Sequence, residues 1–195
     1  MLASIHPLGE RARGQRFFVT AAAYVTGSVV GAAALGAILG GVGRVLFGAD
    51  AFMVRALILG VAALLASVLD WSGTRVPSWP RQVNEDWLAQ FRGWIYGLGF
   101  GLQLGVGVVT IVTTAAVYLT WVAALTTAAP IAGALVGASF GLARAIPLAA
   151  SASLRSPAAI ATRVRLLEAW NGKFRTVTVL SEAAAACVVM IAAVR

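Results

Sequence analysis

The chain has 195 residues, is 60% hydrophobic and 11% charged, and carries a formal net charge of +8. Together with a mean hydropathy of +0.88, this predicts a helical bundle in a membrane and not an average soluble domain. One cysteine, Cys187, and one histidine, His6, exclude an intrachain disulfide, a thiolate metal cage and a Ser/His/Asp triad. The basic residues fall in short connections between apolar runs, which argues against nucleic-acid binding.

The apolar runs predict five transmembrane helices, since a spanning helix needs about 20 residues. We expect a polar cytoplasmic lead over residues 1–16 and a single transmembrane bundle over residues 17–195. The charge-free run that opens the bundle is too long for a signal-peptide core, so we expect it to be uncleaved. The expected spans are about 17–43, 51–70, 94–122, 128–150 and 176–194, and the expected interfacial segments are 71–92 and 151–175.

The longest uncharged stretch is residues 93–143, which contains 51 residues without Asp, Glu, Lys or Arg. It is long enough for two spans, and Pro130 favours a turn over residues 126–130. Each arm has glycines four residues apart, on one helix face, where they allow two backbones to approach closely in lipid. We therefore predict a tightly packed hairpin. The glycines are Gly93, Gly97, Gly101 and Gly105 in the first arm, and Gly133, Gly137 and Gly141 in the second.

The two interfacial segments share a short pattern of residues. Residues 85–92 and 168–175 both read E-x-W-x-x-x-F-R, 83 positions apart. Either a helix-pair unit is duplicated in parallel, or two basic aromatic segments have converged. The residues that we expect at the headgroup level are Trp79, Trp87, Phe91, Arg92, Trp170, Phe174 and Arg175.

The distribution of basic residues predicts the orientation of the bundle. With five spans and a cytoplasmic N-terminus, eleven of the 15 Lys and Arg residues lie inside and three lie outside. Because cytoplasmic loops are enriched in Lys and Arg, this bias favours an N-inside, C-outside topology. A six-span alternative would require one apolar run to be split.

Polar side chains inside the spans are costly in lipid, so each is a candidate functional residue. Arg144 and Glu182 each lie roughly 10 Å from the cytoplasmic end of a span, at 1.5 Å per helical residue, so we predict that they form an ion pair. The pair is either a structural clamp or a gate and coupling site, and Arg144 alone could instead extend to the headgroups. If the pair forms, Glu182→Gln should destabilise the protein.

Three uncharged polar residues lie near mid-membrane and complete the candidate site. Gln103, Thr26 and Ser28 must each find hydrogen-bond partners there, either on a neighbouring helix or on a solute. We expect no metal site, no cofactor and no catalytic residue, because no intramembrane carboxylate pair and no hydrolase or metalloprotease motif is present.

The pattern of small, glycine-rich helices resembles in architecture the LysE-type exporters and the cytochrome-c-biogenesis redox transporters. Both families are usually described with six spans, and the redox family uses paired membrane cysteines that this chain lacks. The resemblance therefore implies no functional residues.

Two functions of different classes remain for this predicted bundle. The first is a small-solute or ion transporter, working as a homo-oligomer, with a site near Gln103, Arg144 and Glu182. The second is a non-catalytic subunit or assembly factor of a larger membrane complex, in which the glycine faces dock partner helices. Either protein would be integral to a membrane, which we expect to be the bacterial inner (plasma) membrane, and neither would be an enzyme.

Overall fold

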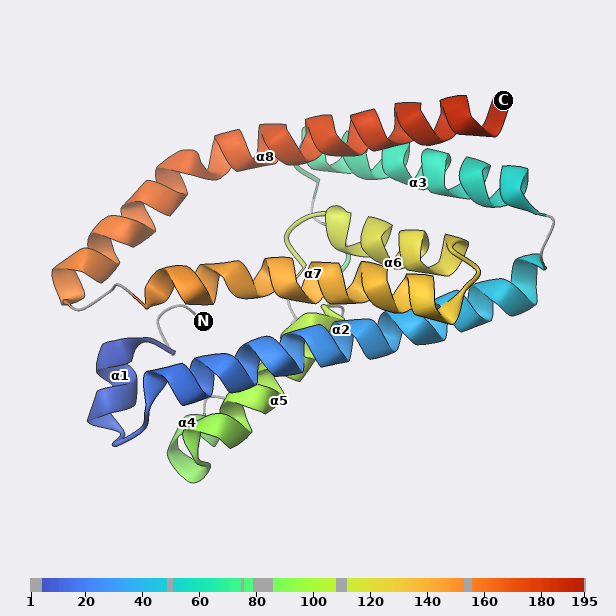
Figure 1. Ribbon diagram of the computed structural model, residues 1–195. Helices are drawn as coiled ribbons and strands as arrows, with labels where there is room; N and C mark the ends of the chain where they lie inside the picture. The colour runs from blue at the N-terminus through green and yellow to red at the C-terminus, as the bar shows by residue number, and fades with distance from the viewer. Residues whose placement is uncertain are drawn as a thin grey trace.

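The computed structural model describes residues 5–48, 51–74, 76–78, 86–107, 112–152 and 156–194, and every regular element in them is helical (Figure 1). The helices are α1 (Pro7–Ala12), α2 (Phe17–Phe47), α3 (Phe52–Ser72), α4 (Trp87–Gln90), α5 (Gly93–Val106), α6 (Ala116–Thr126), α7 (Pro130–Ser151) and α8 (Pro157–Val194). Four described stretches are long and apolar enough to cross a membrane: α2, α3, Pro130–Leu148 and Arg165–Ala193. The all-helical class is confirmed, and four of the five expected spans have a candidate helix.

Helix α2 is the centre of the fold, and α5 and α7 both pack closely along it (Figure 1). Glycines make this approach possible. A Cβ atom added at Gly101 would lie 2.2 Å from the backbone oxygen of Tyr24, and one added at Gly137 would lie 2.0 Å from that of Ala32. No side chain larger than hydrogen fits at such a distance, so the backbones of α5 and α7 are each in direct contact with the backbone of α2.

The predicted packing of the two glycine arms against each other is wrong. Both arms pack on α2, while α5 and α7 touch each other much less. The sequence also contains the reason, because α2 has its own small residues on the contacting faces. A Cβ atom at Gly36 would lie 2.1 Å from the backbone oxygen of Gly133, and one at Gly27 would lie 2.3 Å from that of Leu98. Helix α2 therefore offers a glycine surface to each arm.

The predicted continuous span over residues 94–122 is also wrong. Helix α5 ends at Val106, and Gly107 has a φ of 77°, in the left-handed region that favours glycine. Helix α6 starts only at Ala116. Hydropathy does not detect such a break, because glycine and the neighbouring valines are as apolar as a helix interior. The turn over residues 126–130 is confirmed, since α6 ends at Thr126 and α7 begins at Pro130.

Helix α8 differs from the predicted interfacial segment followed by a new span. It runs without a break from Pro157 to Val194, and it bends along its length (Figure 1). Charged residues mark the edge of a membrane, but Leu, Glu, Ala, Lys and Arg are good helix formers and do not end a helix. The predicted interfacial residues 168–175 are thus part of one continuous, bent helix.

The two E-x-W-x-x-x-F-R copies consequently lie in different local structures. Trp87 and Phe91, with ring centroids 5.9 Å apart, flank the short helix α4, whereas Trp170 and Phe174, 6.1 Å apart, lie within α8. Trp87 also stacks on Phe100 and is half-buried, while Trp170 is exposed. Phe91, Arg92, Phe174 and Arg175 are exposed as well, and Trp79 lies outside the described residues.

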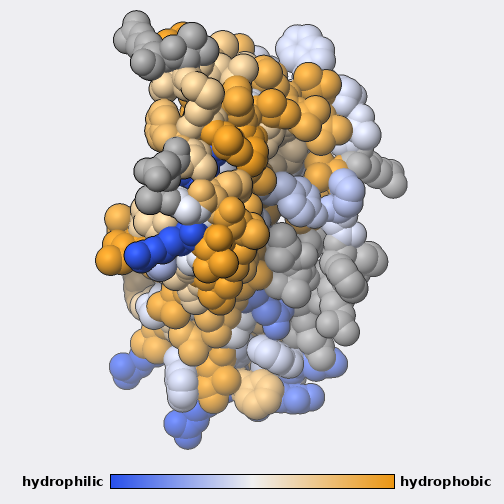
Figure 2. Space-filling view, turned by 90° about the vertical axis from the view of Figure 1, so that its right-hand side faces the viewer, coloured by the Kyte–Doolittle hydropathy of each residue, from blue (hydrophilic) through white to orange (hydrophobic). Residues whose placement is uncertain are grey.

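Helices α3 and α8 form a second unit, which contacts the rest of the described bundle chiefly through α6. The outer side of α3 is apolar and exposed, including Leu57, Leu65 and Val68, as expected of a surface in contact with lipid. Figure 2 shows hydrophobic residues over most of one face of the molecule, with strongly hydrophilic ones gathered mainly at its lower margin. The polar groups described next lie between these apolar surfaces.

Candidate functional site

Arg144 and Glu182 do not form the predicted ion pair. Glu182 is 3% exposed, and neither of its carboxylate oxygens has a hydrogen-bond partner. Arg144 lies instead beside Gly107 at the end of α5, with its guanidinium 5.4 Å from the centroid of the Phe140 ring. The reason is helix pairing: α7 packs on α2, while α8 packs on α3. Equal depth in the membrane does not place two residues together when their helices have different neighbours.

The other predicted site residues do not gather around a common centre. Ser28 is buried and donates a hydrogen bond to the backbone oxygen of Gly141 at 2.8 Å, which joins α2 to α7. Thr26, two residues earlier, is exposed. Gln103 is half-buried on α5. For Ser28, the interpretation as an interhelical hydrogen bond is therefore the one that the geometry supports.

Another buried acid, Asp70, lies at the end of α3, the helix that packs on α8. Asp70 is 8% exposed, and its Oδ1 atom accepts a hydrogen bond from the backbone N–H of Ala115 at 2.8 Å. Its Oδ2 atom, like both oxygens of Glu182, has no partner. The sequence analysis placed Asp70 only at the end of the span expected over residues 51–70. The available signal was an acidic residue that directly follows the uncharged apolar run of residues 56–69.

Contacts between α3 and α8 position these two acids. The hydroxyl of Ser67 donates to the backbone oxygen of Val179 at 3.3 Å, one turn before Asp70 and just before Glu182. At the other end of the contact, Nε of Arg175 donates to the backbone oxygen of Asp70 at 2.7 Å, and Nη2 donates to that of Trp71. These carbonyls end α3 and would otherwise lack a helical partner. Arg175 therefore fixes the end of α3 on α8.

A cavity of about 730 Å³ opens beside Asp70. Its walls are the end of α3, the residues Gly73, Thr74, Val76 and Ser78, residues 112–114 and the part of α8 around Arg175. Hydroxyl groups from Thr74, Thr114 and Thr178 contribute to a mixed polar and apolar lining. Thr178 and Glu182 are four residues apart on α8, so they share a helix face. The cavity therefore lies one helical turn from the buried carboxylate.

A third buried acid, Glu10, was also missed, because residues 1–16 read as a polar lead. Its side chain is fully buried and forms an ion pair of 2.6 Å with Arg13. The hydroxyl of Tyr96 donates to Oε1 at 2.5 Å and to Oε2 at 2.6 Å, and that of Thr20 donates to Oε2 at 2.7 Å. Glu10 therefore joins α1 to α2 and α5, with its charge and its hydrogen bonds satisfied.

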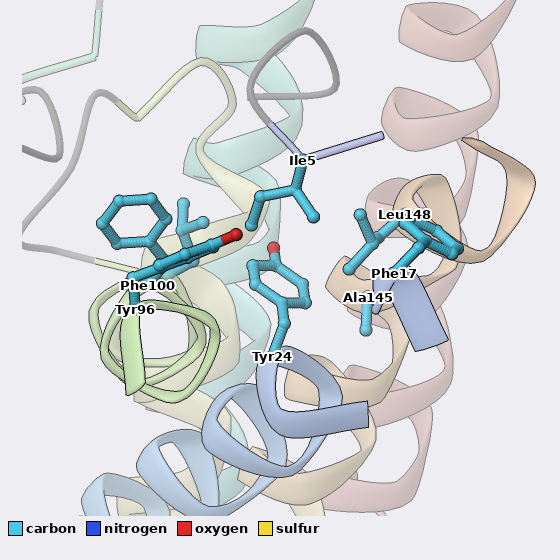
Figure 3. Close-up of a cluster of buried hydrophobic side chains, with 8 residues drawn as sticks. Ile5, Phe17, Tyr24, Tyr96, Phe100, Ala145 and Leu148 are labelled. Carbon is cyan, nitrogen blue, oxygen red and sulfur yellow. The ribbon is translucent and has the colours of Figure 1, made fainter. Parts of the chain in front are cut away.

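Tyr96, which donates to Glu10, belongs to a cluster of buried aromatic and aliphatic side chains. Figure 3 shows Tyr24 of α2 and Tyr96 of α5 turned toward Ile5, with Phe17 and Leu148 on the opposite side. The side chain of Gln15 also accepts a hydrogen bond from the backbone N–H of Gly93 at 3.1 Å, at the start of α5. The amino-terminal segment is thus part of the packed bundle. Glu10 is therefore a structural acid, whereas Glu182 is an acid that the fold leaves without a partner.

Glu10→Gln should destabilise the protein by about 1–3 kcal/mol, the usual cost of breaking buried hydrogen bonds to a charged group. The amide keeps the shape of the side chain, but it leaves Arg13 without its ion pair and places a donor against the hydroxyl groups of Thr20 and Tyr96. Unfolding in detergent micelles and the rate of tryptic cleavage at Arg16 would measure the effect. Glu168→Gln, at an exposed position of α8, is the control. Equal behaviour of the two variants would contradict a structural role for Glu10.

Comparison with known proteins identifies two relatives. The methylamine utilization protein MauF of Paracoccus denitrificans is 33% identical over 139 residues, covering 68% of this chain and 49% of the relative. The protein of the same name from Methylophilus methylotrophus is 31% identical over 153 residues, covering 76% of this chain and 53% of the relative. The chain is related to MauF. No family model matches it, and no solved structure matches it either.

The relationship to MauF and the four apolar helices together show a polytopic membrane protein. The chain spans about half the length of the curated relatives that it matches. Among the described residues, no group of three or more His, Cys, Asp or Glu side chains could hold a metal ion. The two acids between α3 and α8, with the cavity beside them, are therefore the candidate functional site.

Proposed function

We propose that the protein transports a small solute or ion across the membrane, with Glu182 as the coupling group. The observation that carries this proposal is a carboxylate that is 3% exposed and has no partner for either oxygen. An unpaired ionised carboxylate is costly in a medium of low polarity, so Glu182 holds a proton or a bound cation at rest. Releasing that charge and taking it up again is the elementary step of a coupled transporter.

The arrangement of the helices supports this proposal. Helices α2, α5 and α7 are interlocked through their glycines, whereas the α3–α8 unit meets them chiefly through α6. The candidate site thus lies on the more loosely attached unit, where a small displacement would open or close the cavity. Asp70 takes the place that sequence reasoning gave to Arg144. The two groups paired in this way are then both acidic, which suits a proton or cation as the coupling ion.

The finer topology belongs to the same proposal. We keep the five-span, N-inside and C-outside arrangement, with α5 and α6 together in place of the third span. The bias of Lys and Arg supports it. We also propose that the protein is not an enzyme, that it lies in the bacterial inner (plasma) membrane, and that it works as a homo-oligomer. Duplication of a parallel helix-pair unit also remains a proposal, with the repeated residues as its support.

A second candidate function is a non-catalytic subunit or assembly factor, and one observation favours it. Residues 165–177 of α8 are exposed throughout, including Leu166, Leu167 and Trp170. Partner subunits commonly cover such apolar patches. The relatives bear the name of methylamine utilization proteins and are about twice as long as the matched region. A partner of this chain would then belong to a methylamine utilization system.

Flux into proteoliposomes tests the transport proposal. Vesicles with the purified protein would be given gradients of protons, Na⁺, K⁺, amino acids and small anions, and uptake would be followed with a pH-sensitive dye and labelled solutes. We expect flux in the wild type, at least a tenfold loss in Glu182→Gln, and no loss in Glu168→Gln. Equal flux in the two variants, or no flux in the wild type, would contradict a transporter coupled through Glu182 and favour the subunit function.

A further inference from the structure

Two opposite charges line the cavity at the end of α3 without pairing with each other. Asp70 contributes a carboxylate whose Oδ2 atom has no partner, and Arg175 contributes a guanidinium. Each is held by other bonds: Oδ1 of Asp70 accepts from Ala115, and Arg175 donates to the backbone oxygens of Asp70 and Trp71. An ion pair inside a cavity is normally the favourable state of two such groups. Here the backbone keeps them apart.

We infer that this cavity binds a small zwitterion that carries an ammonium and a carboxylate group, the class to which free amino acids belong. The ammonium would lie on Asp70 and the carboxylate on Arg175. Nε of Arg175 lies 2.7 Å from the backbone oxygen of Asp70, so the two charged side chains lie at the same end of α3. A ligand whose own charges are two or three bonds apart is short enough to reach both.

Ligands of a single charge fit this site less well. A cation such as ethylammonium would bind Asp70 but would leave the guanidinium nearby without a counter-charge. An anion such as propionate would bind Arg175 but would be repelled by the carboxylate of Asp70. A zwitterion satisfies both groups, each through a charge-assisted hydrogen bond. The volume of about 730 Å³ lies within the range of small-molecule sites, so it admits an amino acid with a side chain or with water.

The rest of the lining matches this ligand. Ser78, Thr113 and Asn171 offer hydrogen-bonding groups, while Leu69, Val76 and Phe174 offer apolar contacts. Small-molecule sites commonly combine an apolar lining with a few polar groups that fix the orientation of the ligand. The inference rests on the proposed function, because it names the solute class of the cavity beside Glu182. Binding is nevertheless measurable without transport.

Equilibrium binding to the detergent-solubilised full chain tests the inference. L-Alanine, ethylammonium and propionate share nearly the same carbon skeleton, and they carry both charges, the positive charge alone and the negative charge alone. Titration followed by saturation-transfer NMR would give three affinities. We expect L-alanine to bind at least about tenfold more tightly than either analogue, since tenfold corresponds to 1.4 kcal/mol and one charged contact is lost in each.

Variants assign each half of the ligand to its residue. Asp70→Asn keeps an oxygen for the N–H of Ala115 and should abolish the advantage of L-alanine over propionate. Arg175→Gln should abolish the advantage over ethylammonium, and Arg175→Lys, which keeps the charge, should restore part of it if the loss is not one of folding. Lys173→Gln, two residues away and stacked on Trp170, is the control and should bind like the wild type.

The outcomes separate this inference from the transport proposal. The zwitterion site would be overturned if L-alanine bound the wild type no more tightly than ethylammonium or propionate does, or if it did not bind at all. Flux that depends on Glu182 without L-alanine binding would leave the transporter and reject the site. Binding with the expected pattern but without any flux would retain the site and reject transport.

Discussion

Glu182→Leu should raise the free energy of unfolding by about 1–3 kcal/mol, the desolvation cost of a buried polar group without a partner. Leucine has a similar volume, forms helices well and needs no hydrogen bond. The buried position of Glu182 and the absence of a partner for Oε1 and Oε2 are the reasons for the expected gain. The same change should abolish flux. Stability and activity would then change in opposite directions, as at many functional sites.

Unfolding in mixed detergent micelles would measure this gain, with Glu168→Leu as the matched control. Glu168 is on the same helix but exposed, so its replacement should change stability by no more than about 0.5 kcal/mol. The predicted ion pair with Arg144 implied the opposite sign, namely a loss of stability when Glu182 is neutralised. A lower stability of Glu182→Leu would show that Glu182 has a partner, for instance in a second copy of the chain, and would remove the main support for its coupling role.

The helical class and four candidate spans could be predicted because hydrophobic length is a property of the sequence alone. The break after α5 could not, because it depends on the backbone conformation of Gly107 and not on hydropathy. The continuity of α8 past Arg175 was also not predicted, because the charged residues there were misinterpreted. Charge there was taken as a helix boundary, although it only indicates the distance from the membrane.

The candidate site was predicted in part, and the error concerns partners. Glu182 was singled out as a costly acid within a span and is buried there, but its neighbour was chosen by depth. Helix pairing determines the neighbour, and pairing depends on which glycine faces are complementary. Asp70 and Glu10 were missed because both lie where the sequence turns polar. Their burial follows from chain segments that pack over them: Ala115 lies over Asp70, and α2 and α5 cover Glu10 of α1.

Gly137→Ala should lower the free energy of unfolding by about 1–3 kcal/mol or more, the cost of an added methyl group in a well-packed contact. Alanine alone would favour a helix by about 1 kcal/mol over glycine. At this position the new Cβ atom would lie 2.0 Å from the backbone oxygen of Ala32, so α2 and α7 must separate. A backbone oxygen cannot turn away as a flexible side chain can. The clash should therefore outweigh the gain in propensity.

Two other glycines supply the controls for this prediction. At Gly41, on α2, the nearest atom to an added Cβ is Cγ of Pro130 at 3.8 Å, which is an ordinary contact. At Gly172, on α8, nothing lies within 4 Å of an added Cβ. Gly41→Ala should change stability little, and Gly172→Ala should raise it by up to about 1 kcal/mol. If Gly137→Ala behaved like Gly172→Ala, the backbones of α2 and α7 could not be in contact. The separate pairing of α7 with α2 and of α8 with α3, which keeps Arg144 away from Glu182, would then lose its structural basis.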